Sequence, residues 1–280
     1  MIIAGGVFRC ADYPRVECRS GGIGRRDWFK FNCPSGRGGS NPSSGIPASL
    51  DSMCGRYTLA NPDPKRLRLR FGISDSVELD EEPRFNIAPT DPVLAVRGLE
   101  EGRDLGKLRW GLVPGKWATE RKGQPLINAK AETLATQPAF AESFRLRRCL
   151  IPADGFYEWR RDEHGKIPVW IHRPDDELFA FAGVWAEYRP HGGEPIHSCA
   201  IVTCSPNALI RPVHDRMPVV LDQSTEPTWL DPGADPETLM ELLRPAAEGV
   251  LETREVSDLV SNVREDGPAL IEPRAATTLF

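Results

Sequence analysis

The sequence has no hydrophobic stretch that approaches the ~18 residues of a membrane-spanning helix. This absence excludes a transmembrane helix. The chain also has no Cys-x-x-Cys pair among its seven cysteines, which argues against a disulfide framework. The apolar opening, residues 2–8, is short and no basic residue precedes it, so we do not expect a secretory signal. We therefore expect a cytoplasmic protein without a membrane partner, whose thiols stay reduced.

An excess of positive charge is also lacking. The 35 Lys and Arg residues face 40 Asp and Glu residues, which gives a formal net charge of −5. A protein that binds long duplex DNA through charge alone needs many cationic contacts to phosphates, so the composition argues against that class. A basic groove confined to one face is still compatible with the sequence.

Motifs for metals and cofactors are missing as well. No Gly-Lys-Ser or Gly-Lys-Thr follows the glycine-rich stretches, so they do not form a phosphate-binding loop. His197, Cys199 and Cys204 are close in sequence, but no fourth ligand accompanies them. We expect no metal and no cofactor.

The chain divides into two regions of different composition. Residues 1–52 hold 9 of the 25 glycines and 3 of the 7 cysteines, and their glycine- and serine-rich stretch 33–45 has no hydrophobic period. We expect 1–52 to be disordered or a non-native extension. We expect one domain over 53–274, a short tail over 275–280, and a monomer.

Short apolar runs bounded by Gly, Pro or Asp dominate the chain after Met53. They predict seven strands, at Val93–Arg97, Cys149–Pro152, Phe156–Arg160, Val169–His172, Phe179–Ala186, Cys199–Thr203 and Val219–Leu221. Helical spacing of apolar residues predicts three helices, at Asp63–Phe71, Gln137–Arg147 and Asp235–Leu243. Strands outnumber helices and do not alternate with them. The expected class is α+β, with a mainly antiparallel, barrel-like β core and a few flanking helices.

Met53-Cys54 suggests an initiation site, because Cys is small enough for the initiator Met to be removed. A terminal Cys54 would carry both a thiol and an α-amine, and with a pKa near 7.7–8.0 roughly a tenth of that amine is neutral at pH 7. Such an aminothiol can condense with an aldehyde and close to a thiazolidine ring, which an internal cysteine cannot do. A buried structural cysteine is an equal alternative at this point.

Three further segments carry candidate chemistry. If 125–133 is extended, Asn128, Lys130 and Glu132 lie on one side. Asn128 suits an oxyanion and Lys130 a phosphate, although a solvated strand edge is the simpler interpretation. Glu158 sits between two aromatic residues of a strand. It faces either a pocket that makes it a proton carrier or, slightly favoured by position, the surface.

His214 lies between Val213 and Asp215, two residues before Arg216. An imidazole that titrates near neutral pH is a natural proton shuttle, and Arg216 suits a bidentate phosphate contact. A hydrogen-bonded loop histidine is nearly as plausible. The other histidines lie beside Gly, Pro or charged turns, so we expect them to be exposed: His164, His172, His191 and His197.

Taken in order, these segments resemble the SOS response-associated peptidase (SRAP) family, the abasic-site processing proteins. The resemblance covers about 53–274 and rests on six motifs: Met53-Cys54-Gly55-Arg56-Tyr57, Arg84-Phe85-Asn86-Ile87-Ala88-Pro89-Thr90, Arg109-Trp110-Gly111-Leu112-Val113-Pro114, Ile127-Asn128-Ala129-Lys130-Ala131-Glu132-Thr133, Asp154-Gly155-Phe156-Tyr157-Glu158-Trp159 and Val213-His214-Asp215-Arg216-Met217-Pro218. Residues 256–263 are similar to that family's closing segment.

The resemblance implies a single α+β domain that binds single-stranded DNA and captures the aldehyde of an abasic site. It implies that Cys54 is the mature N-terminal nucleophile, that Glu158 and His214 handle protons, and that Asn128 orients the cysteine and the sugar. The implied DNA contacts come from Arg56, Asn86, Trp110, Lys130 and Arg216. Lys130 stands where many members carry Arg, and a lysine lacks the planar two-point grip.

The resemblance also implies autocatalytic exposure of Cys54 and weak strand-cleaving lyase activity. An amide nitrogen is not nucleophilic, so Cys54 can react only after its α-amine is free. We expect translation to begin at Met53. Autocleavage before Cys54 and an inactive copy are the other interpretations of residues 1–53. The competing functions are a conventional cysteine peptidase and a non-covalent module for single-stranded DNA.

Overall fold

The computed structural model describes residues 55–99, 102–114, 125–163 and 165–274. The segment Leu50–Phe280 forms one compact unit. Among the described residues, no helix is long and apolar enough to cross a bilayer. Four of the expected regions, 1–52, Cys54, His164 and the tail 275–280, lie outside this part of the chain.

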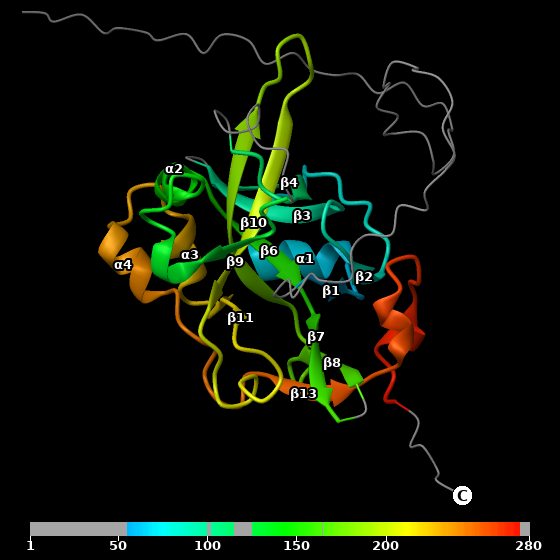
Figure 1. Ribbon diagram of the computed structural model, residues 1–280. Coiled ribbons are helices and arrows are strands. Elements are labelled where there is room, and N and C mark those ends of the chain that lie inside the picture. Colours follow the sequence, from blue (N-terminus) through cyan, green and yellow to red (C-terminus); the bar gives the residue numbers. More distant parts are fainter. Residues whose placement is uncertain (1–54, 100–101, 115–124, 164, 275–280) are drawn as a thin grey trace, which may run out of the picture. The chain divides into compact units, whose positions relative to one another are not determined.

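A closed barrel of five strands forms the centre of this unit (Figure 1). Its members are β3 (Pro92–Leu99), β4 (Gly102–Trp110), β6 (Arg148–Ala153), β9 (Phe179–Tyr188) and β10 (Ile196–Cys204). The order is β10-β4-β3-β6-β9, and pairing of β9 with β10 closes the ring. All of these neighbours are antiparallel except β4 and β10, which run parallel. The expected mainly antiparallel, barrel-like core is confirmed.

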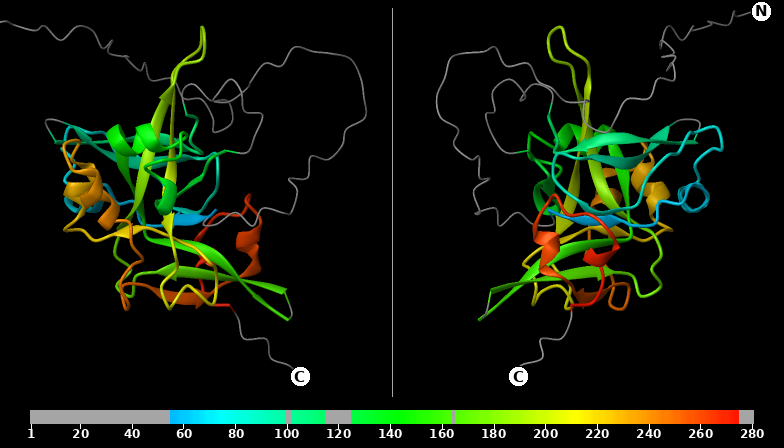
Figure 2. Two further views of the ribbon diagram at one scale, coloured as in Figure 1. Left: turned by 60° about the vertical axis from the view of Figure 1, so that its left-hand side comes forward. Right: turned by 90° about the vertical axis from the view of Figure 1, so that its right-hand side faces the viewer.

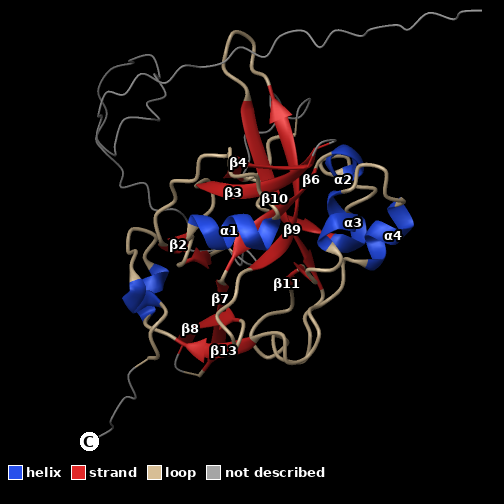
Figure 3. Ribbon diagram, turned by 180° about the vertical axis from the view of Figure 1, so that it is seen from behind, coloured by secondary structure: helices blue, strands red, loops and turns tan. Residues whose placement is uncertain are grey.

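Three short strands extend the barrel around β9 and β10 (Figure 3). β5 (Asn128–Lys130) runs parallel to β10, β11 (Met217–Pro218) pairs with the end of β10, and β12 (Val220–Leu221) pairs with β9. Two of the segments with candidate chemistry, around Asn128 and before Met217, are therefore brought to the same strand.

A second, antiparallel sheet lies below the barrel in both views of Figure 2. Its order is β13-β8-β7-β1-β2, with bounds β13 (Glu252–Glu255), β8 (Gly165–His172), β7 (Gly155–Asp162), β1 (Tyr57–Leu59) and β2 (Arg84–Ile87). β1 thus lies between β7 and β2 and is hydrogen-bonded on both edges. β1, the first strand that the structure describes, is therefore an interior strand of the sheet and not an edge strand.

Short helices cover the outside of the strands. The α-helices are α1 (Pro64–Phe71), α2 (Ala141–Leu146), α3 (Glu226–Leu230) and α4 (Pro236–Glu241), and the 3₁₀ turns are η2 (Ala131–Thr133), η3 (Asp258–Ser261) and η4 (Pro268–Leu270). The Asp63 carboxylate caps the start of α1 by accepting from the Arg66 N–H, and Gly72 ends it in the left-handed region with φ 64°.

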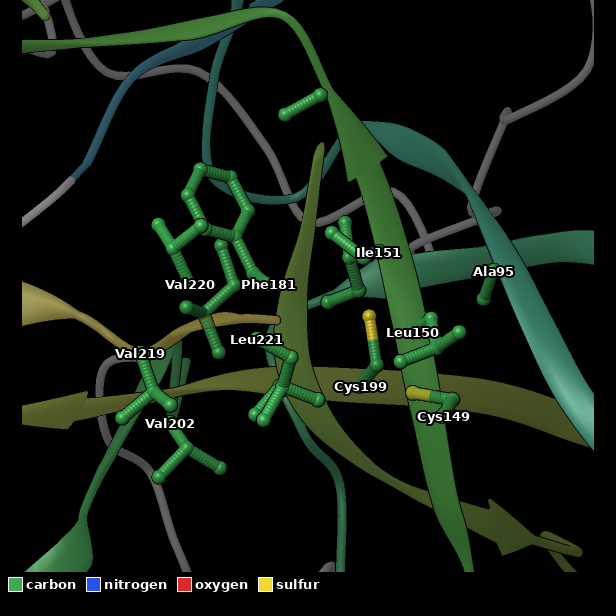
Figure 4. Packing of buried hydrophobic residues seen from close by; sticks show 14 of the residues in the cluster. Ala95, Cys149, Leu150, Ile151, Phe181, Cys199, Val202, Val219, Val220 and Leu221 are labelled. Carbon is green, nitrogen blue, oxygen red and sulfur yellow. The ribbon is translucent and has the colours of Figure 1, made fainter. Parts of the chain in front are cut away.

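The barrel interior forms the main core. Strand β6 is buried at every position, because it packs against the barrel interior on one face and is covered on the other. Figure 4 shows side chains of β6 and β10 meeting there, among them Ile151 and Cys199. A second, smaller cluster packs the lower sheet against the C-terminal segment and consists of Tyr157, Trp170, Val256, Val260 and Leu270.

The seven predicted strands and three predicted helices are confirmed, with shifted ends. The helix expected over 137–147 forms only at Ala141–Leu146, because turns occupy the residues before it. The sequence did not reveal β1, β2, β4, β5, β11, β13 or α3. Most of these are short or polar, so no apolar period marks them.

The turn between β6 and β7 fixes β1 in place. The buried Asp154 carboxylate accepts hydrogen bonds from the N–H groups of Ala60 and Asn61, at 2.6 and 3.0 Å, and from the Thr58 hydroxyl at 2.6 Å. The Trp170 indole donates to the same hydroxyl at 3.2 Å. Burial raises the pKa of Asp154, and these hydrogen bonds oppose that rise.

Gly155 follows this carboxylate and has a different role. A Cβ there would lie 2.1 Å from the Trp170 indole nitrogen, which is much closer than two non-bonded atoms can approach. The missing side chain therefore lets Trp170 lie over the β7 backbone, where it reaches Thr58 and stacks on His172 with 4.0 Å between ring centroids.

We expect Gly155→Ala to lower the free energy of unfolding by about 1–3 kcal/mol, because the methyl group must displace the Trp170 ring. Urea denaturation measures the loss. Gly106→Ala is the matched control: its Cβ would meet nothing nearer than the flexible end of Arg97, at 3.4 Å. The control should change stability by less than about 1 kcal/mol. Equal effects of the two substitutions would contradict this account.

Candidate functional site

Glu158 is buried beside the start of the described chain. β1 and β7 pair with Tyr57 opposite Phe156, and the Tyr157 N–H donates to the Arg56 carbonyl at 3.0 Å. One further step of this antiparallel register brings Gly55 opposite Glu158. The Glu158 side chain is only 3% exposed. The prediction that Glu158 lies at the surface, which the sequence slightly favoured, is therefore wrong. Gly55, the residue that follows Cys54, lies next to this buried carboxyl group.

The faces of β7 explain why its aromatic residues and its carboxyl group separate. Side chains alternate across a strand, so Glu158 shares the face of Phe156, a member of the main core. Tyr157 and Trp159 lie on the other face, against the C-terminal segment. There the Tyr157 hydroxyl donates to the Phe85 carbonyl at 2.8 Å, and the Trp159 indole donates to the Ser261 hydroxyl at 3.1 Å.

Arg56 and Asn86 form one hydrogen-bonded unit. The Arg56 guanidinium donates to the Asn86 side-chain carbonyl at 3.0 Å and to the Val260 backbone carbonyl at 2.8 Å, and it lies 6.0 Å from the centre of the Trp159 ring. Partial burial lowers the pKa of the Arg56 guanidinium below its usual value. The Asn86 amide donates to the backbone carbonyls of Asn262 and Glu265. Asn86 is thus buried and positions Arg56.

A second group of expected site residues gathers at the end of β10. β5 brings Asn128 beside Ile201 and Lys130 beside Thr203. Lys130 is exposed, whereas Asn128 is half-buried. The Arg216 guanidinium makes two hydrogen bonds to the Glu132 carboxylate, at 2.5 and 2.8 Å, and one to the Thr203 carbonyl at 2.7 Å.

His214 lies in the turn before Arg216. Its backbone N–H donates to the Ile210 carbonyl at 2.9 Å, and its ring Nδ1 accepts from the Arg216 backbone N–H at 3.1 Å. The Asp215 carboxylate lies 3.0 Å from the same Nδ1. The His214 side chain is 21% exposed, so one part of the ring is held by the protein and another part faces solvent.

Trp110 was expected to contact DNA, and its burial contradicts that expectation. The residue has no exposed surface. Its indole donates to the Ile127 carbonyl at 3.0 Å, and its ring packs edge-on against Tyr57, 5.4 Å between centroids. Trp110 therefore joins β1 to the residue that precedes Asn128, and its role is to hold the two halves of the site together.

Among the described residues, His172 and the three cysteines are buried. His172 was expected to be exposed, but it is buried at 1% exposure under the Trp170 ring. The described cysteines are Cys149, Cys199 and Cys204, all buried, and burial raises the pKa of Cys149 and of Cys204 to about 12. Protonated, inaccessible thiols are poor nucleophiles. The described residues hold no cluster of three or more His, Cys, Asp or Glu side chains suited to a metal.

The structure thus arranges the expected residues in two groups. Arg56, Asn86 and Glu158 belong to the lower sheet, and Asn128, Lys130, His214 and Arg216 gather at the end of β10; Trp110 contacts elements of both. Sequence reasoning gave no role to Asp154 or Glu132, although both lie within the motifs that it quoted. Asp154 and Glu132 are charged residues within largely apolar motifs, and this pattern could have identified both from the sequence.

Known proteins share these features. A family model described as SOS response associated peptidase (SRAP) matches residues 53–263. The chain belongs to the SRAP family. It is 41% identical over 224 residues to the abasic site processing protein YoqW of Bacillus subtilis, covering 79% of this chain and 99% of that one.

More distant proteins are also similar to this chain. The Escherichia coli abasic site processing protein YedK is 31% identical over 229 residues, covering 79% of this chain and all of that protein. A crystal structure of a Bacteroides thetaiotaomicron protein superposes with a TM-score of 0.69 at 24% identity, covering 79% of this chain and 100% of the other, which shows the same fold.

We expect Trp110→Phe to lower the unfolding free energy by about 1–3 kcal/mol, because the Ile127 carbonyl loses its buried donor. Affinity for undamaged single-stranded DNA should stay unchanged, since Trp110 has no surface to offer. Urea denaturation and fluorescence anisotropy measure the two quantities. A loss of affinity at full stability would show that Trp110 contacts DNA after all.

Proposed function

We propose that this SRAP protein binds single-stranded DNA that contains an abasic site and captures the sugar as a covalent thiazolidine on Cys54. The observation that carries the proposal is the buried Glu158 at the register of Gly55, the residue after Cys54. The names of the relatives YoqW and YedK support the same substrate.

The chemistry proceeds in two bond-forming steps. The neutral α-amine of Cys54 adds to C1′ of the ring-opened sugar, and the adduct loses water to form an imine. The thiol then adds to the imine carbon, and its proton passes to the nitrogen. One water molecule is released overall, and neither step needs an oxidant or a metal.

Glu158 is suited to the proton transfers. It relays a proton to the hydroxyl group that leaves C1′ and accepts one as the thiol adds. Its burial beside β1 favours this role, because a carboxyl group shielded from bulk water passes protons to a bound substrate rather than to solvent. His214 donates to O4′, the oxygen that leaves C1′ when the sugar ring opens, and Asn128 orients the cysteine and the sugar.

The DNA backbone lies along the exposed cations of the site. Lys130 supplies an exposed charge, and Arg56 and Arg216 add the charge of guanidinium groups that protein acceptors hold in place. Asn86 acts indirectly by positioning Arg56. Backbone contacts of this kind make binding depend on salt.

Two side activities follow from the same chemistry. The imine makes the C2′ proton acidic, so loss of that proton expels the 3′ phosphate and breaks the strand before the ring closes. In the full chain the peptide bond before Cys54 must be cut first, because an amide nitrogen cannot form the imine. That cleavage is the hydrolase activity that the family name describes.

Intact mass spectrometry tests the proposal on the full chain and on protein that starts at Met53. With an abasic single-stranded oligonucleotide, we expect protein with a free Cys54 to gain the mass of the oligonucleotide minus one water. Cys54→Ala should give no adduct, whereas the matched control Cys199→Ala, a buried cysteine, should keep it. An adduct on Cys54→Ala would overturn the assignment. Equal non-covalent binding of damaged and intact strands would indicate a binding module, and cleavage of unrelated peptides a conventional peptidase.

Glu158→Gln should slow adduct formation by roughly 10²–10⁴-fold, because the amide keeps the size of the side chain but cannot carry a proton. Its melting temperature and its affinity for undamaged single strands should match those of the parent protein. Quenched time courses on denaturing gels measure the rate. A normal rate would remove Glu158 from the mechanism.

A further inference from the structure

We propose that Glu132 is a positioning residue, which acts through Arg216 to hold His214 as a hydrogen-bond donor at Nε2. This inference rests on the proposed function for its chemical consequence. The arrangement itself is set by contacts among β5, η2, β10 and the turn 214–216, and it is testable without DNA.

The first step is the set of hydrogen bonds to Glu132 and Thr203 that holds the Arg216 side chain, here called the clamp. Both oxygens of the Glu132 carboxylate accept from the guanidinium, and the Thr203 carbonyl accepts a third hydrogen bond. Two-point carboxylate–guanidinium pairs fix direction as well as distance. The hydrogen bond from Arg216 lowers the pKa of Glu132, so the carboxylate stays charged at neutral pH. The Arg216 side chain is only 13% exposed, which leaves it little room to leave this position.

The second step is that the fixed side chain of Arg216 also fixes the position of its backbone. Met217, the next residue, pairs with Cys204 on β10, so the backbone of Arg216 is held on one side by β11 and on the other by its own side chain. Its N–H then points at Nδ1 of His214, 3.1 Å away. The imidazole ring is tied to β10 through this single hydrogen bond and the clamp behind it.

The third step is the tautomer. A ring nitrogen that accepts a hydrogen bond carries no proton, so the neutral His214 ring must carry its proton on Nε2. If His214 is protonated, Nδ1–H donates to the Asp215 carboxylate, whose oxygen lies 3.0 Å from Nδ1, instead of accepting from the Arg216 N–H, and Nε2 still carries hydrogen. The donor at Nε2 is present in both protonation states.

The charged groups around His214 come from two directions. Asp215 and Arg216 belong to its own turn and contact it directly. Lys130, Glu132 and the Cys204 thiol, which burial keeps protonated, come from β5, η2 and β10 and form the electrostatic surroundings of the Arg216 side chain. Asp215 is 87% exposed and therefore weakly constrained. The Arg216 N–H is the directional partner of Nδ1, and Glu132 is the residue that fixes it.

Loss of the Glu132 carboxylate would separate binding from reaction. Glu132→Gln removes a negative charge from a face that meets DNA, so affinity for undamaged single strands should stay equal or rise. The clamp loses one of its two acceptor oxygens and its charge, so the His214 ring can populate both neutral tautomers. We expect the rate of adduct formation to fall by about tenfold, within the range that a positioned acid or base contributes.

Nitrogen-15 NMR of the imidazole rings tests the positioning directly. In the parent protein we expect the His214 signal, identified by its absence from His214→Gln, to report a proton on Nε2 at neutral pH. In Glu132→Gln the same signal should move toward a tautomer average. The matched control is Glu255→Gln, which breaks an exposed Glu255–Arg160 pair on the lower sheet and should change neither the tautomer nor the rate.

Each outcome separates this inference from the proposed function. An unchanged His214 tautomer in folded Glu132→Gln would overturn the inference, whatever the rate of adduct formation. A shifted tautomer with an unchanged rate would confirm the positioning and remove His214 from the reaction. If Glu132→Gln fails to fold, Glu132→Asp keeps the charge on a side chain one methylene shorter, and the same spectrum decides: an unshifted signal there would overturn the inference.

Discussion

The pairing of β1 with β7 is the constraint on which the site depends. β1 has only three residues, yet it is hydrogen-bonded on both edges and anchored by the Asp154 carboxylate at its far end. A strand that short contributes little stability by itself. The buried carboxylate, the Thr58 hydroxyl and the Trp170 indole therefore determine the path of the chain at Gly55, and with it the distance from Glu158 to any group that precedes Gly55.

Segments from opposite ends of the chain surround that strand. Arg56 donates to the carbonyl of Val260, 204 residues later, and Asn86 holds Asn262 and Glu265. These contacts use polar atoms that would otherwise be buried without partners, so the C-terminal segment and the N-terminal strand stabilise each other. The orientation of a cation beside the reacting centre is in this way coupled to the folding of the last turns of the domain.

The sequence predicted the barrel better than it predicted the site. Barrel strands such as β6 and β9 are apolar on both faces and therefore visible as continuous runs. β13 reads Glu-Thr-Arg-Glu, with no buried side chain to mark it, and β1 is too short to show a period. The motifs identified the family and most of the residues that gather at the two halves of the site.

The sequence could not predict which face of a strand each residue occupies. Glu158 seemed slightly better suited to the surface and Trp110 to a DNA contact, and the structure reverses both. Period-two alternation assigns residues to opposite faces, but only the partner strands decide which face is covered. The sequence placed Glu132 on the side of Asn128 and Lys130 but gave it no role, because its partner Arg216 lies 84 residues away.

The charge distribution favours capture over affinity. Of the residues expected to contact DNA, Lys130 is exposed, Arg56 and Arg216 are half-buried and bound to protein acceptors, and Asn86 and Trp110 are buried. Among the described residues of the site, this small number of available cations predicts weak, salt-sensitive binding to an intact strand under the proposed function. Under the proposed function, weak binding would allow release from undamaged DNA, and the proposed covalent bond to an aldehyde would retain the protein where a base is missing. Selectivity for the lesion would then depend on reaction at one carbon atom rather than on the affinity of the protein for the DNA backbone. The proposed role of Glu132 is consistent with this, because its carboxylate neutralises a cation that could bind DNA and orients a histidine that serves the reaction.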